Sequence, residues 1–188
     1  MVNRALPRLH GLLEIADPYL LIDIGGATTD IHYSRDLVRD NLVTESAYDR
    51  MVFKKLGVYK SRESLVYSAR NNEYVFELLG HLGVTENILD ERSDTATRVL
   101  MQLAIFLVLF KMSRYHSEYI ELELERLNSI LFTGGISKVL SDEEIETVVR
   151  FFYRKILRYH RPPATVVDRD YAIRTLGLLS TSEEKERA

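Results

Sequence analysis

The pattern of hydrophobic positions begins with a continuous apolar run, YLLIDI, directly after Pro18. A run of this length that ends at glycines is typical of a strand buried on both faces. The next segment, TDIHYS at residues 29–34, alternates polar and apolar side chains and is therefore predicted to pair beside the first strand. Residues 36–44 show a weaker pattern and are expected to form a third strand.

From Glu45 the pattern changes to a helical period. Gly57 is placed to end a short helix, as glycine often does past a helix end. The residues that share one face of this expected helix are Ala47, Met51, Val52, Lys55 and Leu56. Two more helices are predicted at 61–70 and 72–83, the second closed by its glycines.

A long helix is predicted from Ser93 or Asp94, as the capping residue, to about His116. Its middle, VLMQLAIFLVLF, is apolar on nearly all sides, so we expect it at the centre of the core. A bilayer span needs about 20 apolar residues. This run is shorter and contains Gln102, so the sequence predicts a buried helix and no membrane association.

The last third of the chain holds a second strand followed by a glycine pair. The apolar residues ILF lead into TGG, and a helical period follows. Ser141 and Glu144 have the spacing of a capping box, which predicts a new helix at that point. One short strand is expected in RPPATVVDRD and a last helix in YAIRTLGLL. The whole is predicted to be one α/β domain at 18–180, with a leader or broken segment at 1–17 and a mobile tail at 181–188.

Composition narrows the classes of function. The 188 residues are 46% hydrophobic, enough for one buried core. The net charge is -3, and 25 basic residues are mixed with 28 acidic ones along the chain. No basic patch for nucleic acid or an anionic membrane is therefore expected. With no cysteine, disulfides, cysteine nucleophiles and thiolate metal sites are excluded, and the cytoplasm is the predicted compartment.

The first glycine pair carries the strongest candidate chemistry. A buried strand delivers Asp23 to its carboxyl end, and Gly25 and Gly26 then offer backbone N–H groups with no side chain in the way. Such an array can hold anionic oxygens. Glycine pairs are also common in hairpin turns that bind nothing. On these residues alone, a phosphate site and a plain hairpin both remain open.

Neighbouring polar residues favour the phosphate site. Asp23 and Asp30 flank the loop and can hold Mg²⁺ through its water shell, since this ion prefers oxygen ligands. Thr28 and Thr29 add hydroxyl donors. The sequence therefore contains a candidate metal and phosphate site in one hairpin.

The second pair, Gly134 and Gly135, lies between a predicted strand and a predicted helix. This arrangement lets the backbone approach a nucleotide closely and brings helix N–H groups near its phosphates. A turn that simply needs glycine is the alternative interpretation. A single site between two strand ends, with one loop for phosphate and metal and one for the nucleoside, explains both pairs together.

The motifs LLIDIGGATTD and ILFTGGISK resemble the second half of the actin, sugar-kinase and heat-shock-chaperone ATPase superfamily. More narrowly, DIGGATTDIH, FTGG and VVDRDYAIRTLGLL resemble the MutL/GlmL family, accessory proteins of cobalamin-dependent glutamate mutase and related aminomutases. The resemblance covers roughly residues 19–179.

This resemblance implies an actin-like ATPase lobe of the ribonuclease H-like type, with a small mixed sheet and surrounding helices. It implies that ATP and Mg²⁺ are the cofactors, with Asp23 and Asp30 as the catalytic and metal-binding carboxylates. The implied nucleotide contacts are Gly25, Gly26, Thr28 and Thr29 for phosphate, and Gly134 and Gly135 for the nucleoside. The family is thought to reactivate its mutase by ATP-driven release of damaged cobalamin, so the implied partner is a cobalamin-dependent mutase or its subunits. The DRDY signature at 168–171 implies no particular chemistry.

Two departures from the family matter. An acidic-glycine-aspartate element usually follows the hairpin, and here the segment reads AYDRMVFKKLGVY. The superfamily also binds nucleotide between two lobes, each with its own phosphate hairpin, whereas this chain has one. The second lobe is therefore expected before Met1 or in another chain, and little ATPase activity is expected from this chain alone, because phosphoryl transfer needs charge stabilisation from several sides.

Two other classes of function remain open. The chain can be a fragment of a small-molecule kinase of the same superfamily, or a non-catalytic interaction module that has lost its nucleotide. The five histidines lack zinc-binding spacing, and His32 is expected to be a surface residue of its strand.

Overall fold

The computed structural model describes residues 18–34, 37–38, 48–115 and 122–173 of the 188-residue chain. The predicted leader at 1–17, the tail at 181–188 and most of the predicted last helix lie outside these ranges. The elements below therefore belong to the predicted domain at 18–180.

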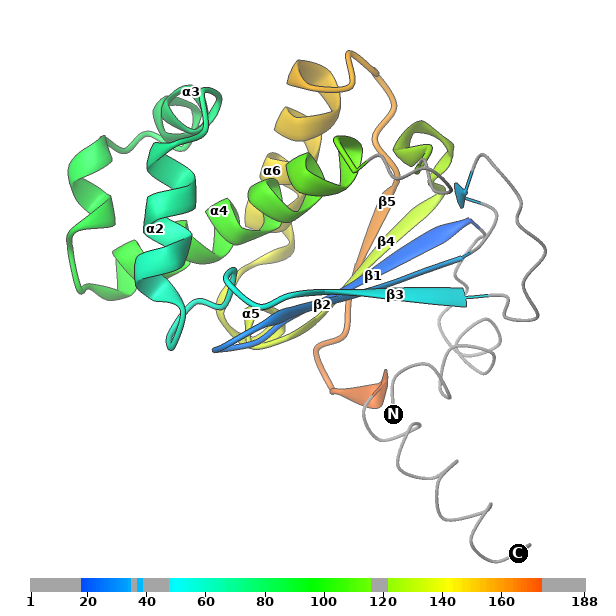
Figure 1. Ribbon diagram of the computed structural model, residues 1–188, viewed down its shortest axis with the longest axis horizontal. Helices are drawn as coiled ribbons and strands as arrows, with labels where there is room; N and C mark the ends of the chain where they lie inside the picture. Colours follow the sequence, from blue (N-terminus) through cyan, green and yellow to red (C-terminus); the bar gives the residue numbers. More distant parts are fainter. Residues whose placement is uncertain (1–17, 35–36, 39–47, 116–121, 174–188) are drawn as a thin grey trace, which may run out of the picture.

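One mixed β-sheet forms the centre of the fold (Figure 1). Its strand order is β3-β2-β1-β4-β5. Strand β2 is antiparallel to β1 and β3, whereas β4 is parallel to β1 and β5 is parallel to β4, so only β2 runs against the others. The strands are β1 (Tyr19–Ile24), β2 (Thr29–Ser34), β3 (Tyr48–Phe53), β4 (Ser129–Gly134) and β5 (Ala164–Val167). This topology confirms the predicted α/β class with a small mixed sheet and surrounding helices.

Strand β3 corrects the predicted helix that ends at Gly57. Residues 48–53 pair with β2 along their whole length. Met51 and Phe53 pack against the core while Arg50 and Val52 are exposed, which is the alternation of a strand. Over a run this short, the same apolar positions also fit a helical period, and pairing with β2 decides between them. Of the strand expected at 36–44, only two residues are described, and Val38 makes an isolated bridge to Leu122.

The helices pack in a layer beside the sheet (Figure 1). Helices α4 and α6 pack against each other, α4 contacts β1, and α2 and α3 lie beyond α4. The helices are α2 (Arg62–Arg70), α3 (Val75–His81), α4 (Asp94–Ser113), α5 (Ile136–Val139) and α6 (Asp142–Lys155), with 3₁₀ turns at Glu86–Leu89 and Leu124–Arg126. Helices α2, α3, α4 and α6 were all predicted from the sequence.

Helix α4 is the buried core helix that its apolar composition predicts. By length and hydropathy alone it is also long enough to cross a membrane, but 72% of its most apolar window is buried inside the protein. The hydroxyl of Ser93 caps it by accepting a hydrogen bond from Ala96 N at 3.1 Å. The predicted capping box of α6 is present too, with Ser141 Oγ accepting from Glu144 N at 3.2 Å. These caps fix where both helices begin.

Strand β1 is buried on both faces, as its continuous apolar run predicts. Leu20, Ile22 and Ile24 belong to the core cluster shared with the helices. Leu21 faces the other way, yet it is also fully buried. Only Asp23, near the carboxyl end of the strand, is partly exposed. The interior of β1 therefore serves stability, and its carboxyl end is the place where chemistry is accessible.

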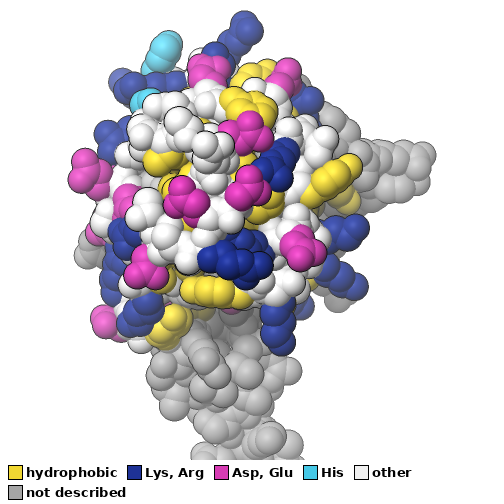
Figure 2. Space-filling model, turned by 90° about the vertical axis from the view of Figure 1, so that its left-hand side faces the viewer, with side chains coloured by type: hydrophobic (Ala, Val, Ile, Leu, Met, Phe, Trp, Pro, Cys, Tyr) yellow, Lys and Arg dark blue, Asp and Glu magenta, His cyan; other side chains and the backbone are white. Residues whose placement is uncertain are grey.

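The surface at the α2 and α3 end of the molecule carries no single sign of charge. Figure 2 shows basic and acidic side chains intermingled across this face, with hydrophobic side chains scattered among them. Among the exposed large hydrophobic residues, Tyr67 belongs to α2 and Phe76 to α3. Scattered apolar side chains of this kind are ordinary on protein surfaces.

Candidate functional site

The two predicted glycine loops meet at the carboxyl ends of β1 and β4. From β1 the chain builds β2 and β3 on one side, and it later adds β4 and β5 on the other. The boundary between β1 and β4 is therefore the topological switch point of the sheet. In open α/β sheets, ligands bind in the crevice outside the carboxyl ends of the strands at such a point.

Gly134 lies directly against the end of β1. Its φ is +82°, a backbone conformation that residues with a side chain rarely adopt. A Cβ at this position would lie 2.3 Å from Asp23 Oδ1 and 2.8 Å from the carbonyl oxygen of Ile24. The next amide, Gly135 N, donates to the same carbonyl at 3.0 Å. The end of β1 and the Gly134–Gly135 loop, more than 100 positions apart in the sequence, are therefore in direct contact through backbone atoms.

The Gly134–Gly135 loop differs in one respect from the predicted nucleotide loop. The helix that follows, α5, is a single turn of four residues. Because Gly135 N is already bonded to Ile24 O, this amide is not offered to a phosphate. The loop provides close approach without side chains, which suits a nucleoside better than a phosphate.

The β1–β2 turn at 25–28 is held from one side by residues 57–60, which we call the strap. Val58 N donates to Gly25 O at 3.3 Å, and both Tyr59 N and Lys60 N donate to Gly26 O, at 2.9 and 2.7 Å. The hydroxyl of Ser61 donates to Ala27 O at 2.7 Å. Three consecutive carbonyls of the turn are therefore directed toward the strap and its following residue.

The opposite side of the turn presents N–H groups. In a trans peptide the N–H points away from the C=O of the same unit. The amides of Gly26, Ala27 and Thr28 share their peptide units with the three carbonyls that face the strap, so these N–H groups point away from it. No hydrogen bond between described residues uses them. Gly25 N instead closes the turn by donating to Thr28 O at 2.9 Å. Successive free amides of this kind form an anion-binding concavity.

Three lysines lie on segments whose backbone borders this turn. Lys54 and Lys55 follow β3, whose last residue pairs with Thr29, and Lys60 belongs to the strap. All three side chains are exposed, and none forms an ion pair within the described part of the chain. Their positive charge adds to the attraction that the turn amides exert on an anion.

The two aspartates predicted to bind metal are direct cross-strand partners, Asp23 on β1 and Asp30 on β2. Such partners have Cβ atoms about 5 Å apart on the same face of a sheet. The strand register thus places the two aspartates opposite each other on neighbouring strands. Asp30, however, already has a cation: Arg50 of β3 donates from Nε to Asp30 Oδ1 at 3.0 Å and also from Nη2.

A magnesium ion at Asp30 would share this carboxylate with protein donors. The other oxygen of Asp30, Oδ2, accepts from the hydroxyl of Thr28 at 3.3 Å. Both oxygens of Asp30 are therefore engaged by protein donors. No group of three or more histidine, aspartate or glutamate side chains that could hold a metal ion occurs among the described residues. The predicted Mg²⁺ site at Asp23 and Asp30 therefore stays a prediction.

The two predicted threonine donors have different surroundings. Thr28 is half-buried at the turn and bonds to Asp30, as described. Thr29 is fully buried, and its hydroxyl donates to Leu56 O at 3.0 Å. It faces the helices with Ile24, its cross-strand partner. Thr29 therefore anchors the segment before the strap and does not offer its hydroxyl to a phosphate.

His32 corrects the expectation of a surface histidine. It is only 4% exposed and pairs with Arg50 across β2 and β3. Burial lowers the pKa of its imidazole to about 4, with a further lowering by Arg50 and an opposing effect of Asp30. The side chain is therefore neutral near pH 7, and it contributes no positive charge to the site.

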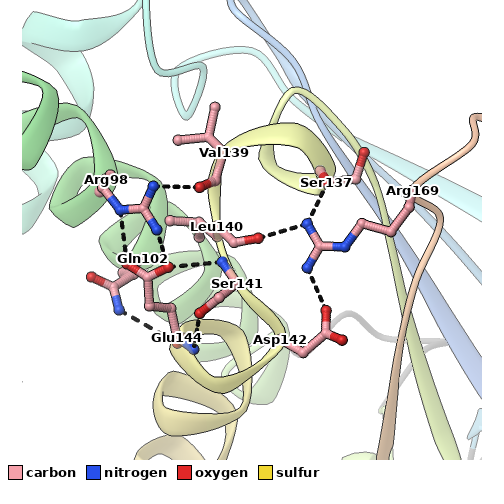
Figure 3. A network of polar contacts seen from close by, with 9 residues as sticks. All are labelled: Arg98, Gln102, Ser137, Val139, Leu140, Ser141, Asp142, Glu144 and Arg169. Carbon is pink, nitrogen blue, oxygen red and sulfur yellow. Dashed lines mark hydrogen bonds and ion pairs between the residues drawn. The ribbon is translucent and has the colours of Figure 1, made fainter.

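The DRDY signature has a structural role in which two of its residues hold the glycine loop. Asp168 is buried and accepts from the hydroxyl of Thr133 at 3.0 Å and from Ala172 N at 2.8 Å. Arg169 donates to the carbonyls of Ser137 and Leu140, at either end of α5, and forms an ion pair with Asp142 (Figure 3). These contacts tie the end of β5 to the residues around Gly134 and Gly135.

The neighbouring polar contacts in Figure 3 fix the start of α6. Arg98 of α4 donates to both carboxylate oxygens of Glu144 and to Val139 O. Glu144 in turn accepts from Ser141 N at 2.7 Å. The short segment between α5 and α6 is thus held by Arg98 of α4 on one side and by Arg169 on the other. These contacts also restrain α5, which directly follows the Gly134–Gly135 loop.

A cavity of about 530 Å³ lies elsewhere, between α3 and α6. Its lining includes His81, Arg150, Phe151 and Arg154. None of its lining residues belongs to the turn, the strap or the Gly134–Gly135 loop. The turn residues 25–28 are partly buried, and the candidacy of the turn rests on the direction of its amides and on its place in the sheet.

Sequence reasoning missed three parts of this site. Ala27 supplies a turn amide although its side chain gives no signal. The strap was not predicted to contact the turn. The glycine at position 57 was interpreted as a helix end, whereas in the structure it is needed for close approach, because a Cβ there would lie 2.2 Å from the carbonyl carbon of Ala27. Arg50 was hidden inside the segment predicted as helix, where its partner on β2 could not be foreseen.

Comparisons with known proteins give weak similarities only. No family model and no curated protein matches the sequence. Among solved structures, the ethanolamine utilization protein EutJ from Carboxydothermus hydrogenoformans matches with a TM-score of 0.39 and 13% identity over 93% of this chain, which spans about half, 52%, of that chain. The activator of the 2-hydroxyisocaproyl-CoA dehydratase from Clostridium difficile, solved with bound ADPNP, matches with a TM-score of 0.38 and 15% identity over 100% of this chain and 68% of that chain. Scores this low assign neither a family nor a function.

Proposed function

We propose that this chain binds an adenine nucleotide, ATP or ADP, at the carboxyl ends of β1 and β4. The phosphates lie on the amides of Gly26, Ala27 and Thr28, and the nucleoside lies over Gly134 and Gly135. The observation that carries the proposal is the orientation of the turn: the strap takes its carbonyls, which leaves three successive N–H groups facing outward at the switch point of the sheet.

The local charge supports an anionic ligand. The chain as a whole has a net charge of -3, yet Lys54, Lys55 and Lys60 all lie on segments that border the turn. Lysine is a common phosphate-binding residue because its ammonium is a compact point charge. A plain hairpin turn does not need this concentration of unpaired cations.

We propose binding, and not hydrolysis, as the activity of this chain by itself. Asp30, the second predicted catalytic carboxylate, is engaged by Arg50 and Thr28. Efficient phosphoryl transfer also needs charge stabilisation from several sides, and the superfamily that the sequence resembles supplies it with two lobes. Turnover would require a second lobe, from this protein or from another chain.

The finer proposal, which rests on the sequence resemblance, is that nucleotide binding couples to a cobalamin-dependent mutase. In this proposal the chain is the nucleotide-binding part of a MutL/GlmL-like reactivating chaperone, and the energy of ATP drives release of damaged cofactor from the mutase. The cytoplasm is the compartment in which such an assembly would work.

The nucleotide site is tested with Gly135→Val. Gly135 has an ordinary helical φ of -57°, and a Cβ there would lie 3.6 Å from Ile24 O, which is a normal contact. The fold should therefore tolerate a side chain that stands over the proposed nucleoside position. We expect calorimetric titration to show ATP and ADP binding to the wild type and at least about tenfold weaker binding to Gly135→Val, a loss of about 1.4 kcal/mol.

Gly80→Val is the matched control, because Gly80 in α3 has no atom within 4 Å of its Cβ position and lies far from the turn in the fold. Its nucleotide affinity should equal that of the wild type. The proposal fails if neither nucleotide binds the wild type, or if both variants bind equally well.

A further inference from the structure

We infer that Arg169 is a positioning residue for the nucleoside half of the proposed site, and that this half is supported separately from the β1–β2 turn. The inference rests on the proposed nucleotide function and deepens it. It gives a role in ligand selection to a residue of the DRDY signature, to which the sequence assigned no chemistry. The two ligands that this role distinguishes are a nucleoside diphosphate and an inorganic diphosphate.

The Gly134–Gly135 loop depends on α5 for its orientation. Gly135 is the residue that caps the start of α5, and the hydroxyl of Ser137 in this helix donates to Gly134 O at 2.9 Å. Helix α5 is a single turn of four residues. A helix this short is not stable by itself, because forming the first turn is unfavourable. Contacts from outside α5 must therefore hold it in place.

Arg169 supplies this support from the segment after β5. Carbonyls near a helix C-terminus have no partners inside the helix. Those of Ser137 and Leu140 both accept hydrogen bonds from Arg169 Nη1, at 2.7 Å for Leu140. Arg169 Nη2 forms an ion pair with Asp142, the first residue of α6. Figure 3 shows the guanidinium between these three partners, so one planar group fixes α5 against the start of α6.

The preceding residue, Asp168, holds the other side of the loop. Its carboxylate accepts from the hydroxyl of Thr133 at 3.0 Å, and Thr133 directly precedes Gly134 in β4. The backbone of Asp168 is also fixed to β4, because Asp168 N donates to Phe132 O at 2.8 Å. Two adjacent residues after β5 thus hold the loop from its β4 side and from its α5 side.

The β1–β2 turn is held by different contacts. Its carbonyls at residues 25–27 accept hydrogen bonds from the strap and from Ser61. The side-chain contacts of Arg169 go to Ser137, Leu140 and Asp142, none of which belongs to the turn or the strap. Loss of the guanidinium should therefore disturb the nucleoside half of the site and leave the turn amides in place.

The test is calorimetric titration of ADP and of pyrophosphate into the wild type, Arg169→Gln and Arg169→Lys. Pyrophosphate requires the turn alone, whereas ADP also contacts the loop. We expect Arg169→Gln to bind ADP at least about tenfold more weakly than the wild type, and to bind pyrophosphate with the same affinity within about twofold. Arg169→Lys keeps the charge but not the planar fork, so its ADP affinity should lie between those of the wild type and Arg169→Gln.

Arg126→Gln is the matched control. Arg126 forms an exposed ion pair with Glu123 just before β4, at the opposite end of this strand from the loop. Its affinity for both ligands should equal that of the wild type. Pyrophosphate binding by each variant also shows that the turn is folded. If Arg169→Gln does not fold, Arg169→Lys replaces it in the same comparison.

The outcomes separate the inference from the proposed function. If folded Arg169→Gln binds ADP as well as Arg126→Gln does, or loses affinity for ADP and pyrophosphate equally, the inference is overturned while nucleotide binding stands. Binding of ADP but not of pyrophosphate by the wild type would also overturn it, because the two halves would then not be separable. If the wild type binds neither ligand, the proposed function and the inference both fail.

Amide hydrogen exchange without ligand gives a second readout. Leu140 N donates to Ile136 O across α5 at 3.0 Å, and Gly25 N closes the β1–β2 turn. In Arg169→Gln the Leu140 amide should exchange at least about tenfold faster than in the wild type, because α5 opens more often. The Gly25 amide should exchange at its wild-type rate. Unchanged exchange at Leu140, or equal acceleration at both amides, would contradict a separate support for the loop.

Discussion

Replacing Gly134 with alanine is expected to lower the free energy of unfolding by about 3 kcal/mol or more. Part of this cost comes from the φ of +82°, which an L-residue adopts with difficulty. The larger part comes from the added methyl group, which would lie 2.8 Å from Ile24 O. That carbonyl cannot move away easily, because it accepts the hydrogen bond from Gly135 N. Urea denaturation measures the loss.

Gly83→Ala provides the matched control for this prediction. Gly83 has a φ of +73°, but nothing lies within 4 Å of its Cβ position. This variant should therefore lose only the conformational part, about 1 kcal/mol. Equal losses in the two variants would contradict the close contact between β4 and β1 on which the site depends.

Acidification is expected to destabilise the protein through His32. Its pKa is about 4 in the folded protein and near 6.5 when the chain is unfolded, so only the unfolded state gains a proton between these values. Stability from this residue is complete above about pH 6.5 and falls as the pH drops toward 4. Between about pH 6.5 and about pH 4.5 the loss should be about 2 kcal/mol.

Urea denaturation at both pH values, compared between the wild type and His32→Gln, isolates this effect from the titration of carboxylates. The substitution itself alters stability at every pH, so the relevant quantity is the difference in pH dependence. The variant should lose about 2 kcal/mol less than the wild type on acidification. Identical pH dependence in the two proteins would show that His32 is not buried as a neutral side chain.

The sequence predicted the elements whose signals are local. The apolar run of β1, the apolar length of α4 and the capping box at Ser141 each carry enough information in one short segment to fix an element. The segment of β3 does not carry enough local information, because Met51 and Val52 fit a helical face as well as a strand. Its identity depends on pairing with β2, which is a long-range contact that no local pattern encodes.

The residues of the candidate site likewise fall into those that a local pattern predicts and those that depend on long-range contacts. Asp23 and both glycine pairs could be found from the sequence, because strand ends followed by glycines are a recognisable pattern. The contacts that orient the turn could not, because they are backbone hydrogen bonds between residues 25–27 and the strap, and such bonds leave almost no trace in side-chain identity. The partnership of Arg50 with Asp30 likewise follows only from the register of β2 and β3.

The central claim, that the β1–β2 turn and the Gly134–Gly135 loop form one nucleotide site, is tested most directly by nuclear magnetic resonance. ADP is titrated into ¹⁵N-labelled protein while the backbone amides are followed. The account predicts shifts at Gly26, Ala27 and Thr28 together with Gly134 and Gly135, and no change at Gly80 in α3. Shifts confined to α3 and α6, beside the 530 Å³ cavity, or no shifts at all, would contradict it.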